Sequence, residues 1–131
     1  MSEENVEALR AVYSAWGRGD LRPGEDLYAP DVVSTWQVPE GRIVSRGPQE
    51  VGRNLRKFLK QWAHFRMEAD EFIELDDNVL VVVRVYGKGK QSGAETEAHN
   101  FHVWVFNRGK AVGHHVYFDR AAALESAGLR E

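Results

Sequence analysis

The strongest structural signal in this chain lies in three consecutive stretches, VLVVVRVYG (79–87), ETEAHNFHVWVF (95–106) and AVGHHVYF (111–118). Each stretch is rich in β-branched and aromatic residues and is bounded by turn-forming Gly, Asn, Ser or Lys, which is typical of a β-strand. The three stretches also hold four of the five histidines. Because aromatic walls with a few inward polar groups are typical of small-molecule pockets, we expect a curved sheet around a binding cavity.

Length and composition fit a single domain over residues 1–131, with enough apolar side chains for a core. The formal net charge is -3 and no basic stripe is visible, so we expect no nucleic-acid partner. No apolar run is long enough to cross a bilayer, and the acidic N-terminus is unlike a signal peptide, so we expect no membrane partner. The lack of cysteine excludes disulfides and Cys-bound metals and favours the cytoplasm.

Upstream of these strands, the spacing of apolar residues predicts three helices. The first helix begins near Ser2 and stops at Gly17, because its apolar residues fall three or four positions apart and share one face. Those residues are Val6, Leu9, Val12, Tyr13 and Trp16. A short second helix is expected from Asp20 to Tyr28, and a third begins at Pro48. The apolar face of the third helix is Val51, Leu55, Phe58, Leu59 and Trp62.

Further strands are predicted at 32–38, at 43–44 and over 65–73, where Ile73 falls on the apolar face and Phe72 on the polar face. The chain closes with a short helix over 120–127, for which Asp119 is the expected N-cap and Gly128 the expected C-cap. Helices followed by an antiparallel meander make an α+β pattern. We therefore predict three helices against the concave face of one strongly bent antiparallel sheet.

Five motifs resemble the nuclear transport factor 2-like superfamily and, within it, the SnoaL-like polyketide cyclase and ketosteroid isomerase branch. They are AVYSAWGRGD (11–20), LYAPDVV (27–33), SRGPQEV (45–51), FHVWVFNRGK (101–110) and VYFDRAAALESAGL (116–129). The resemblance covers nearly the whole chain and implies a cone-shaped α+β barrel with an apolar cavity, often dimerising through its sheet. The family includes isomerases, cyclases, epoxide hydrolases, dehydratases and non-catalytic modules, so the motifs specify the fold better than the function.

The resemblance implies roles for particular positions. Tyr13 matches the tyrosine that steroid isomerases use as an oxyanion donor, and His102 stands where they have a second, protonated acid. Trp36 occupies the position of their catalytic base, and a tryptophan cannot take a proton. Asp119 matches the aspartate of the polyketide cyclases. The epoxide hydrolases need an Asp-Arg-Asp cluster, and no aspartate pair is visible on the strands to flank Arg84.

His102 is the main candidate for chemistry, because it shares a strand face with Asn100 and Trp104 and an ordinary imidazole titrates near neutral pH. The competing interpretation is a structural histidine in the cavity wall. His99 lies three positions earlier and must face away, so the pair does not predict a metal site. Asp119 also has a structural interpretation, as the N-cap of the last helix.

His114 and His115 face opposite sides of their strand, and the turn at 107–109 decides which of them joins His102. A two-residue turn places His115 opposite His102, and a three-residue turn places His114 there. An arginine at the first central position of a primed turn is unfavourable, which favours the three-residue turn, whereas Asp119 as a cavity residue favours His115 together with Tyr117. A bulge would change the register again.

We therefore predict that the cone binds a small apolar or aromatic metabolite, with neither cofactor nor metal. Tyr13 and His102 would carry acid/base chemistry of an isomerase, cyclase or dehydratase, with Asp119 as a third catalytic candidate. The predicted ligand-binding residues are Trp16, Trp36, Asn100, Trp104, His115 and Tyr117. The alternative is a non-catalytic dimeric ligand-binding or protein-interaction module. If His102 faces inward, then Phe101, Val103 and Val105 face outward, so we expect a homodimer built on the sheet.

Overall fold

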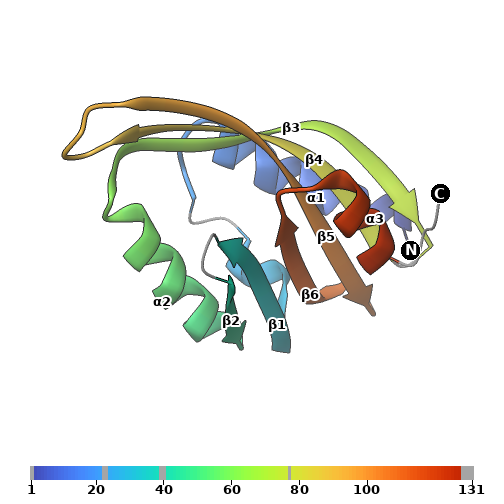
Figure 1. Cartoon of the computed structure of the whole chain (residues 1–131). Coiled ribbons are helices and arrows are strands. Elements are labelled where there is room, and N and C mark those ends of the chain that lie inside the picture. Colours follow the sequence, from blue (N-terminus) through green and yellow to red (C-terminus); the bar gives the residue numbers. More distant parts are fainter. Residues whose placement is uncertain (1, 22–23, 39–40, 77, 128–131) are drawn as a thin grey trace.

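The computed structural model describes residues 2–21, 24–38, 41–76 and 78–127, and shows helices on both sides of one strongly curved sheet (Figure 1). The elements are α1 (Ser2–Gly17), the 3-10 helix η1 (Glu25–Leu27), β1 (Tyr28–Val38), β2 (Gly41–Arg46), α2 (Pro48–Leu59), β3 (Trp62–Leu75), β4 (Asn78–Gly89), β5 (Glu95–Asn107), β6 (Lys110–Tyr117) and α3 (Arg120–Ser126). The α+β class and the bent sheet predicted from the sequence are confirmed.

The six described strands lie in the order β2-β1-β6-β5-β4-β3, with β2 and β3 as open edges, so the cone is not closed. Neighbouring strands run antiparallel except for β1 and β6, which run parallel because the last strand inserts between β1 and β5. The predicted antiparallel meander is therefore β3 to β6, and the first two strands extend it into a mixed sheet.

The main core lies on the concave face, where α1 runs along β3 and β4. Its apolar stripe fits the predicted helix face, because side chains three or four positions apart point the same way. The fully buried members of this core include Leu9, Val79, Val81, Val83 and Trp104. The helix α2 covers the other end of the concave face, beside β1 and β2. The concave face is thus divided between two helices.

The helix α3 lies against the outer face of the sheet, where Ala123 and Leu124 pack on Leu80 and Val103. Val103 is only 1% exposed, because α3 covers it. Part of the outward apolar surface from which we predicted a sheet-built homodimer is therefore buried within the chain itself. The homodimer stays a prediction, with a weaker basis than the sequence alone provides.

Two predicted helix boundaries are wrong. The expected helix from Asp20 to Tyr28 is reduced to η1, because Gly24 has a φ of 119°, which no α-helix accommodates. The third helix ends at Leu59, and Trp62 begins β3 with its ring directly over Gly87, where a side chain would clash. The predicted cap at Gly128 lies outside the described residues.

Because of a bulge in β3, two residues lie on the faces opposite to those predicted. Ala69 pairs with Val83 and Glu71 pairs with Val82, so Asp70 is an extra residue in the ladder. Beyond it the alternation is reversed: Phe72 joins the concave core, whereas Ile73 packs with the α3 cluster on the outer face. The prediction had these two residues the other way round.

Candidate active site

A hydrogen-bonded group of aromatic side chains is buried at the centre of the concave face. The hydroxyl of Tyr13 on α1 accepts a hydrogen bond from Trp104 Nε1 at 2.9 Å and lies 2.7 Å from His102 Nδ1. Tyr13, Trp104 and His102 are at most 3% exposed. The helix and β5 therefore bring together the two residues that the sequence proposed for catalysis.

His114 on β6 extends this group. Its Nε2 lies 3.1 Å from His102 Nδ1, and its Nδ1 lies 3.2 Å from the hydroxyl of Tyr28 on β1. The ring of His114 stacks on Trp104 with 3.7 Å between ring centroids and 12° between the planes. We call Trp104, Tyr13, His102, His114 and Tyr28 the inner network.

The register of β5 and β6 explains why His114 joins the inner network. The turn has two residues, because Arg108 and Gly109 both have positive φ and Asn107 pairs with Lys110. Of the two turns left open, the two-residue turn is the one present. Val112 is then an extra residue, so that Trp104 pairs with His114. The two-residue turn alone would place His115 opposite His102, but this bulge, the third possibility, reverses the alternation and turns His114 inward.

Three predicted site residues lie away from the inner network. His115 faces the outer side, where its Nδ1 lies 2.8 Å from the Thr35 hydroxyl. Tyr117 donates a hydrogen bond from its hydroxyl to Ser126 on α3. Asp119 is exposed and accepts a hydrogen bond from the backbone N–H of Ala122, as the predicted N-cap of α3. The structure does not bring these three side chains to His102.

The remaining predicted lining residues divide between two groups. Trp16 packs edge-on against Tyr13 with 4.8 Å between ring centroids, so it adjoins the inner network. Trp36 instead packs on Phe58 of α2, in a second aromatic group that also holds Trp62 and Phe65. The register places Asn100 on the same face as His102. The predicted lining residues are therefore split between two groups, and Trp16 and Trp104 pack against Tyr13 instead of lining an open cavity.

Burial keeps the inner network neutral. It lowers the pKa of His102 to about 3, and it lowers the pKa of His114 well below its usual value, with smaller contributions from His102 and His115. Burial also raises the pKa of the Tyr13 hydroxyl well above its usual range. His102 therefore does not share the near-neutral pKa of an ordinary imidazole, and its ring is neutral at neutral pH.

The hydrogen-bond pattern also favours one proton position. Trp104 Nε1 can only donate, so of these two partners of the Tyr13 hydroxyl only His102 Nδ1 can accept its proton. A neutral imidazole that accepts at Nδ1 carries its proton at Nε2. His102 Nε2 is buried and has no hydrogen-bond partner among the described residues. The inner network thus ends in one unpaired N–H donor.

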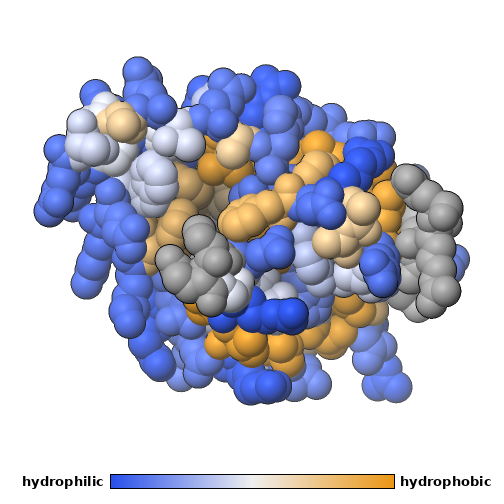
Figure 2. All heavy atoms as spheres, in the orientation of Figure 1, coloured by the Kyte–Doolittle hydropathy of each residue, from blue (hydrophilic) through white to orange (hydrophobic). Residues whose placement is uncertain are grey.

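A hollow of about 380 Å³ lies between α2, the segment after α1 and the start of β3. Its walls include Leu21, Leu55, Leu59, Trp62 and Phe65, with Asp20 and Arg56 as charged residues. Apolar side chains are visible toward the centre of the face that Figure 2 shows, with hydrophilic side chains around them. Sequence reasoning missed this hollow because it treated the apolar residues of α2 as core.

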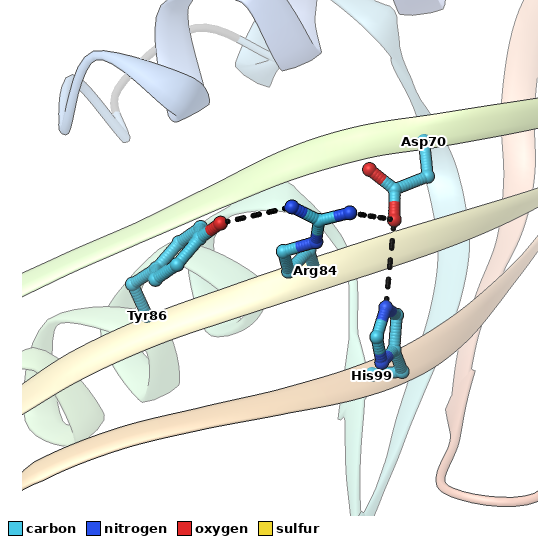
Figure 3. Close-up of polar contacts among 4 residues, drawn as sticks. All are labelled: Asp70, Arg84, Tyr86 and His99. Atoms are coloured by element: carbon cyan, nitrogen blue, oxygen red, sulfur yellow. Dashed lines mark hydrogen bonds and ion pairs between the residues drawn. The ribbon is translucent and has the colours of Figure 1, made fainter.

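A second polar group lies on the outer face of β3, β4 and β5 (Figure 3). Arg84 donates hydrogen bonds to the Tyr86 hydroxyl and to Asp70 Oδ2, both at 3.2 Å, and His99 Nε2 lies 3.5 Å from the same carboxylate oxygen. The hydrogen bond to the Tyr86 hydroxyl makes the largest contribution to raising the pKa of Arg84, and the negative charge of Asp70 raises it further. We call these four residues the outer cluster. The bulge at Asp70 brings this aspartate to Arg84, a pairing that the sequence did not reveal.

Among the described residues, no three His, Cys, Asp or Glu side chains converge in a way that could hold a metal ion. No helix in the described part of the chain is both long enough and apolar enough to cross a membrane.

Comparisons with known proteins identify a matching family and similar solved structures. The family model for the SnoaL-like domain matches residues 9–114. The chain is similar to an NTF2-like protein of unknown function from Burkholderia pseudomallei, with 29% identity, a TM-score of 0.77 and coverage of 93% of this chain and 95% of that one. It is also similar to TerC, which was co-crystallised with polyporic acid, with 23% identity, a TM-score of 0.75 and coverage of 95% and 98%.

A third similar structure is a protein with a ketosteroid isomerase-like fold from Catenulispora acidiphila, in complex with trimethylamine. It is 14% identical, with a TM-score of 0.71 and coverage of 99% of this chain and 96% of that one. No curated protein matches the chain at a significant level.

Proposed function

We propose, since this chain belongs to the SnoaL-like domain family, that it binds a small, largely apolar or aromatic metabolite within the cone. The observation that supports this proposal is the hollow beside α2. Its volume of about 380 Å³ suits a small molecule, and its walls combine aliphatic residues with the aromatic rings of Trp62 and Phe65. A similar fold accommodates an organic ligand in TerC, which was co-crystallised with polyporic acid.

A second candidate function is acid/base catalysis next to a carbonyl group. The observation that favours it is the unpaired Nε2 of the buried His102 ring. The buried Nε2–H has no partner, and a buried donor without a partner costs about 1–3 kcal/mol of stability. A ligand carbonyl that reached this donor would satisfy it. Negative charge developing on the carbonyl oxygen during an isomerisation, cyclisation or dehydration would then be stabilised by a donor already held in place.

Tyr13 has an indirect role in this mechanism. The resemblance to steroid isomerases implies that it donates directly to the substrate, but here its proton points to His102 Nδ1. Tyr13 and Trp104 therefore hold the His102 ring in one orientation and one protonation state, and His102 Nε2 is the group that would meet the ligand. If no substrate reaches His102 Nε2, the same hydrogen bonds have only a structural role, and the protein is the non-catalytic module.

Ligand binding is tested by thermal shift with a panel of aromatic ketones, hydroxylated naphthoquinones and steroids. Leu55→Trp fills the hollow and should abolish the stabilisation that a bound compound produces. Lys57→Trp is the matched control, because Lys57 is exposed on the same helix. If no compound stabilises the protein, or if Leu55→Trp and Lys57→Trp respond alike, the proposed binding site is wrong.

Catalysis is tested separately with His102→Asn, whose amide can replace Nδ1 but has no atom at Nε2. For a compound that the wild type converts, the variant should still bind it but lose about a hundred-fold or more in kcat. Turnover by His102→Asn at the wild-type rate would exclude His102 as the catalytic group and leave the binding function standing.

A further inference from the structure

The inner network continues from the buried His102 toward the surface. His102 Nδ1 lies 3.1 Å from His114 Nε2, and His114 Nδ1 lies 3.2 Å from the Tyr28 hydroxyl. His102 and His114 are 2% and 4% exposed, whereas Tyr28 is only partly buried. Each imidazole therefore has one nitrogen toward the interior and one toward the next group, which is the arrangement that a proton relay needs.

The protons in this path can be assigned to one consistent order. When the Tyr28 hydroxyl donates to His114 Nδ1, the neutral His114 ring carries its proton at Nε2, pointing to His102 Nδ1. His102 Nδ1 then accepts, which agrees with the proton at His102 Nε2 that Trp104 and Tyr13 impose. Tyr13 and His114 thus share the single lone pair of His102 Nδ1 as a three-centre hydrogen bond, and both contacts favour the same form of His102.

We infer that His114 and Tyr28 form a proton relay that keeps the His102 ring neutral while it transfers a proton to the ligand, an inference that rests on the proposed acid/base function. When His102 Nε2–H gives its proton to the ligand, His114 Nε2 passes a proton to His102 Nδ1. Tyr28 passes its proton to His114 Nδ1, and a solvent water reprotonates the Tyr28 oxygen. Both rings stay neutral but end protonated at Nδ1. When the ligand returns its proton to His102 Nε2, the reverse shift restores Nε2–H on both rings and returns the proton to water.

Tyr13 is a poor alternative source for this proton, although its hydroxyl also contacts His102 Nδ1. Its other hydrogen-bond partner in the inner network is Trp104, and an indole N–H does not give up its proton at neutral pH, so Trp104 cannot return a proton to Tyr13. Burial raises the pKa of Tyr13 well above its usual range, which disfavours the phenolate that proton loss would leave. Tyr13 therefore positions His102, and His114 supplies it.

The relay is tested without a ligand by long-range ¹H–¹⁵N spectra of ¹⁵N-histidine-labelled protein at neutral pH. In the wild type, His102 and His114 should both be neutral, with the proton at Nε2. Tyr28→Phe removes only the hydroxyl, so the ¹⁵N resonance of His114 Nδ1 should shift because that nitrogen loses its hydrogen-bond donor. Thr35→Val is the matched control, because it removes a hydroxyl that contacts His115 on the opposite face and should leave His102 and His114 unchanged.

Wild-type His114 protonated at Nδ1, or a His114 spectrum that Tyr28→Phe does not change, would overturn the relay. A failed ligand panel would instead overturn the proposed function, so the two failures are distinguishable. With a convertible compound, Tyr28→Phe should lower kcat about a hundred-fold while KM stays constant, because the relay moves protons and does not hold the ligand. A change in KM alone would contradict the relay.

Discussion

The strand β5 presents two histidines to opposite faces of the sheet, in two very different environments. His102 belongs to the inner network and is 2% exposed, and its contacts are with neutral aromatic groups. His99, three residues earlier, belongs to the outer cluster, where its side chain is 51% exposed beside Asp70. The outer cluster combines an arginine and a carboxylate, whereas the inner network contains no charged group at neutral pH.

The difference shows that a single strand can place the same residue type in two different chemical environments. An odd spacing places the two side chains on opposite faces. On the concave face, burial penalises the charged imidazole, so the ring is confined to its neutral form and held by fixed hydrogen bonds. On the outer face, water screens the charges, so the ion pairs contribute little to stability. Chemistry that needs a preorganised donor is therefore expected inside.

The largest expected effect comes from removing one histidine at a time. His102→Ala should lower the free energy of unfolding by about 3 kcal/mol, because it leaves a cavity and breaks the contacts with Tyr13 and His114. His99→Ala should change it by about 0.5 kcal/mol or less. Urea denaturation of both variants measures this. Equal losses would mean that the inner network is no better packed than the outer cluster.

The pH dependence of stability should come mainly from the inner network. The pKa of His102 is about 3 in the folded state and near 6.5 when unfolded, so the unfolded chain binds more protons between these values. Stability should therefore fall as the pH falls from 6.5 toward 3, by at most about 1.4 kcal/mol per pH unit for this group. His114 adds in the same direction. Denaturation curves at several pH values should show a smaller slope for His102→Asn than for the wild type.

A matched pair of tyrosine variants should give a smaller difference. Tyr13→Phe leaves Trp104 Nε1 without its acceptor and should cost about 1–2 kcal/mol. Tyr86→Phe removes the hydroxyl that accepts from Arg84, but water can replace it at this half-exposed site, so stability should stay the same. Thermal unfolding compares the two. A greater loss for Tyr86→Phe would place the more important hydrogen bond on the outer face.

The smallest effect is expected from the ion pairs of the outer cluster. Asp70→Asn removes the negative charge beside Arg84 and His99, whose partly exposed side chains remain hydrated. Any loss of stability should disappear when the salt concentration rises, because exposed ion pairs are screened. Urea denaturation at low and high salt tests this. A loss that persists at high salt would show that the outer cluster is effectively buried.

The parts of the fold that the sequence predicted depend on local patterns. The stripe of α1, the proline at the start of α2 and the Asp119 cap are each set by residues within a few positions. The proximity of Tyr13 and His102 was also expected, though from the family resemblance and not from the residues alone. The three local features were predicted correctly because none of them depends on the register of a distant strand.

The parts that were missed depend on two bulges. The extra residues Asp70 and Val112 reverse the alternation in β3 and β6, which exchanges Phe72 with Ile73 and brings His114 inward in place of His115. A single extra residue has no periodic signature. Gly113 was the one available signal, since a glycine inside a strand often marks a bulge. A Cβ added at Gly113 would lie 2.9 Å from His115 Nε2, so a larger residue there would force the His115 side chain to move.

The protonation state of His102 is the direct test of a neutral, preorganised inner network. It is measured by following the ring nitrogens of ¹⁵N-histidine-labelled protein as the pH is lowered from 8 to 4. We expect His102 to keep one protonated nitrogen, Nε2, over this whole range, because burial holds its pKa at about 3. A His102 that gains a second proton with a midpoint near the ordinary value of about 6.5 would contradict the neutral network and the donor role derived from it.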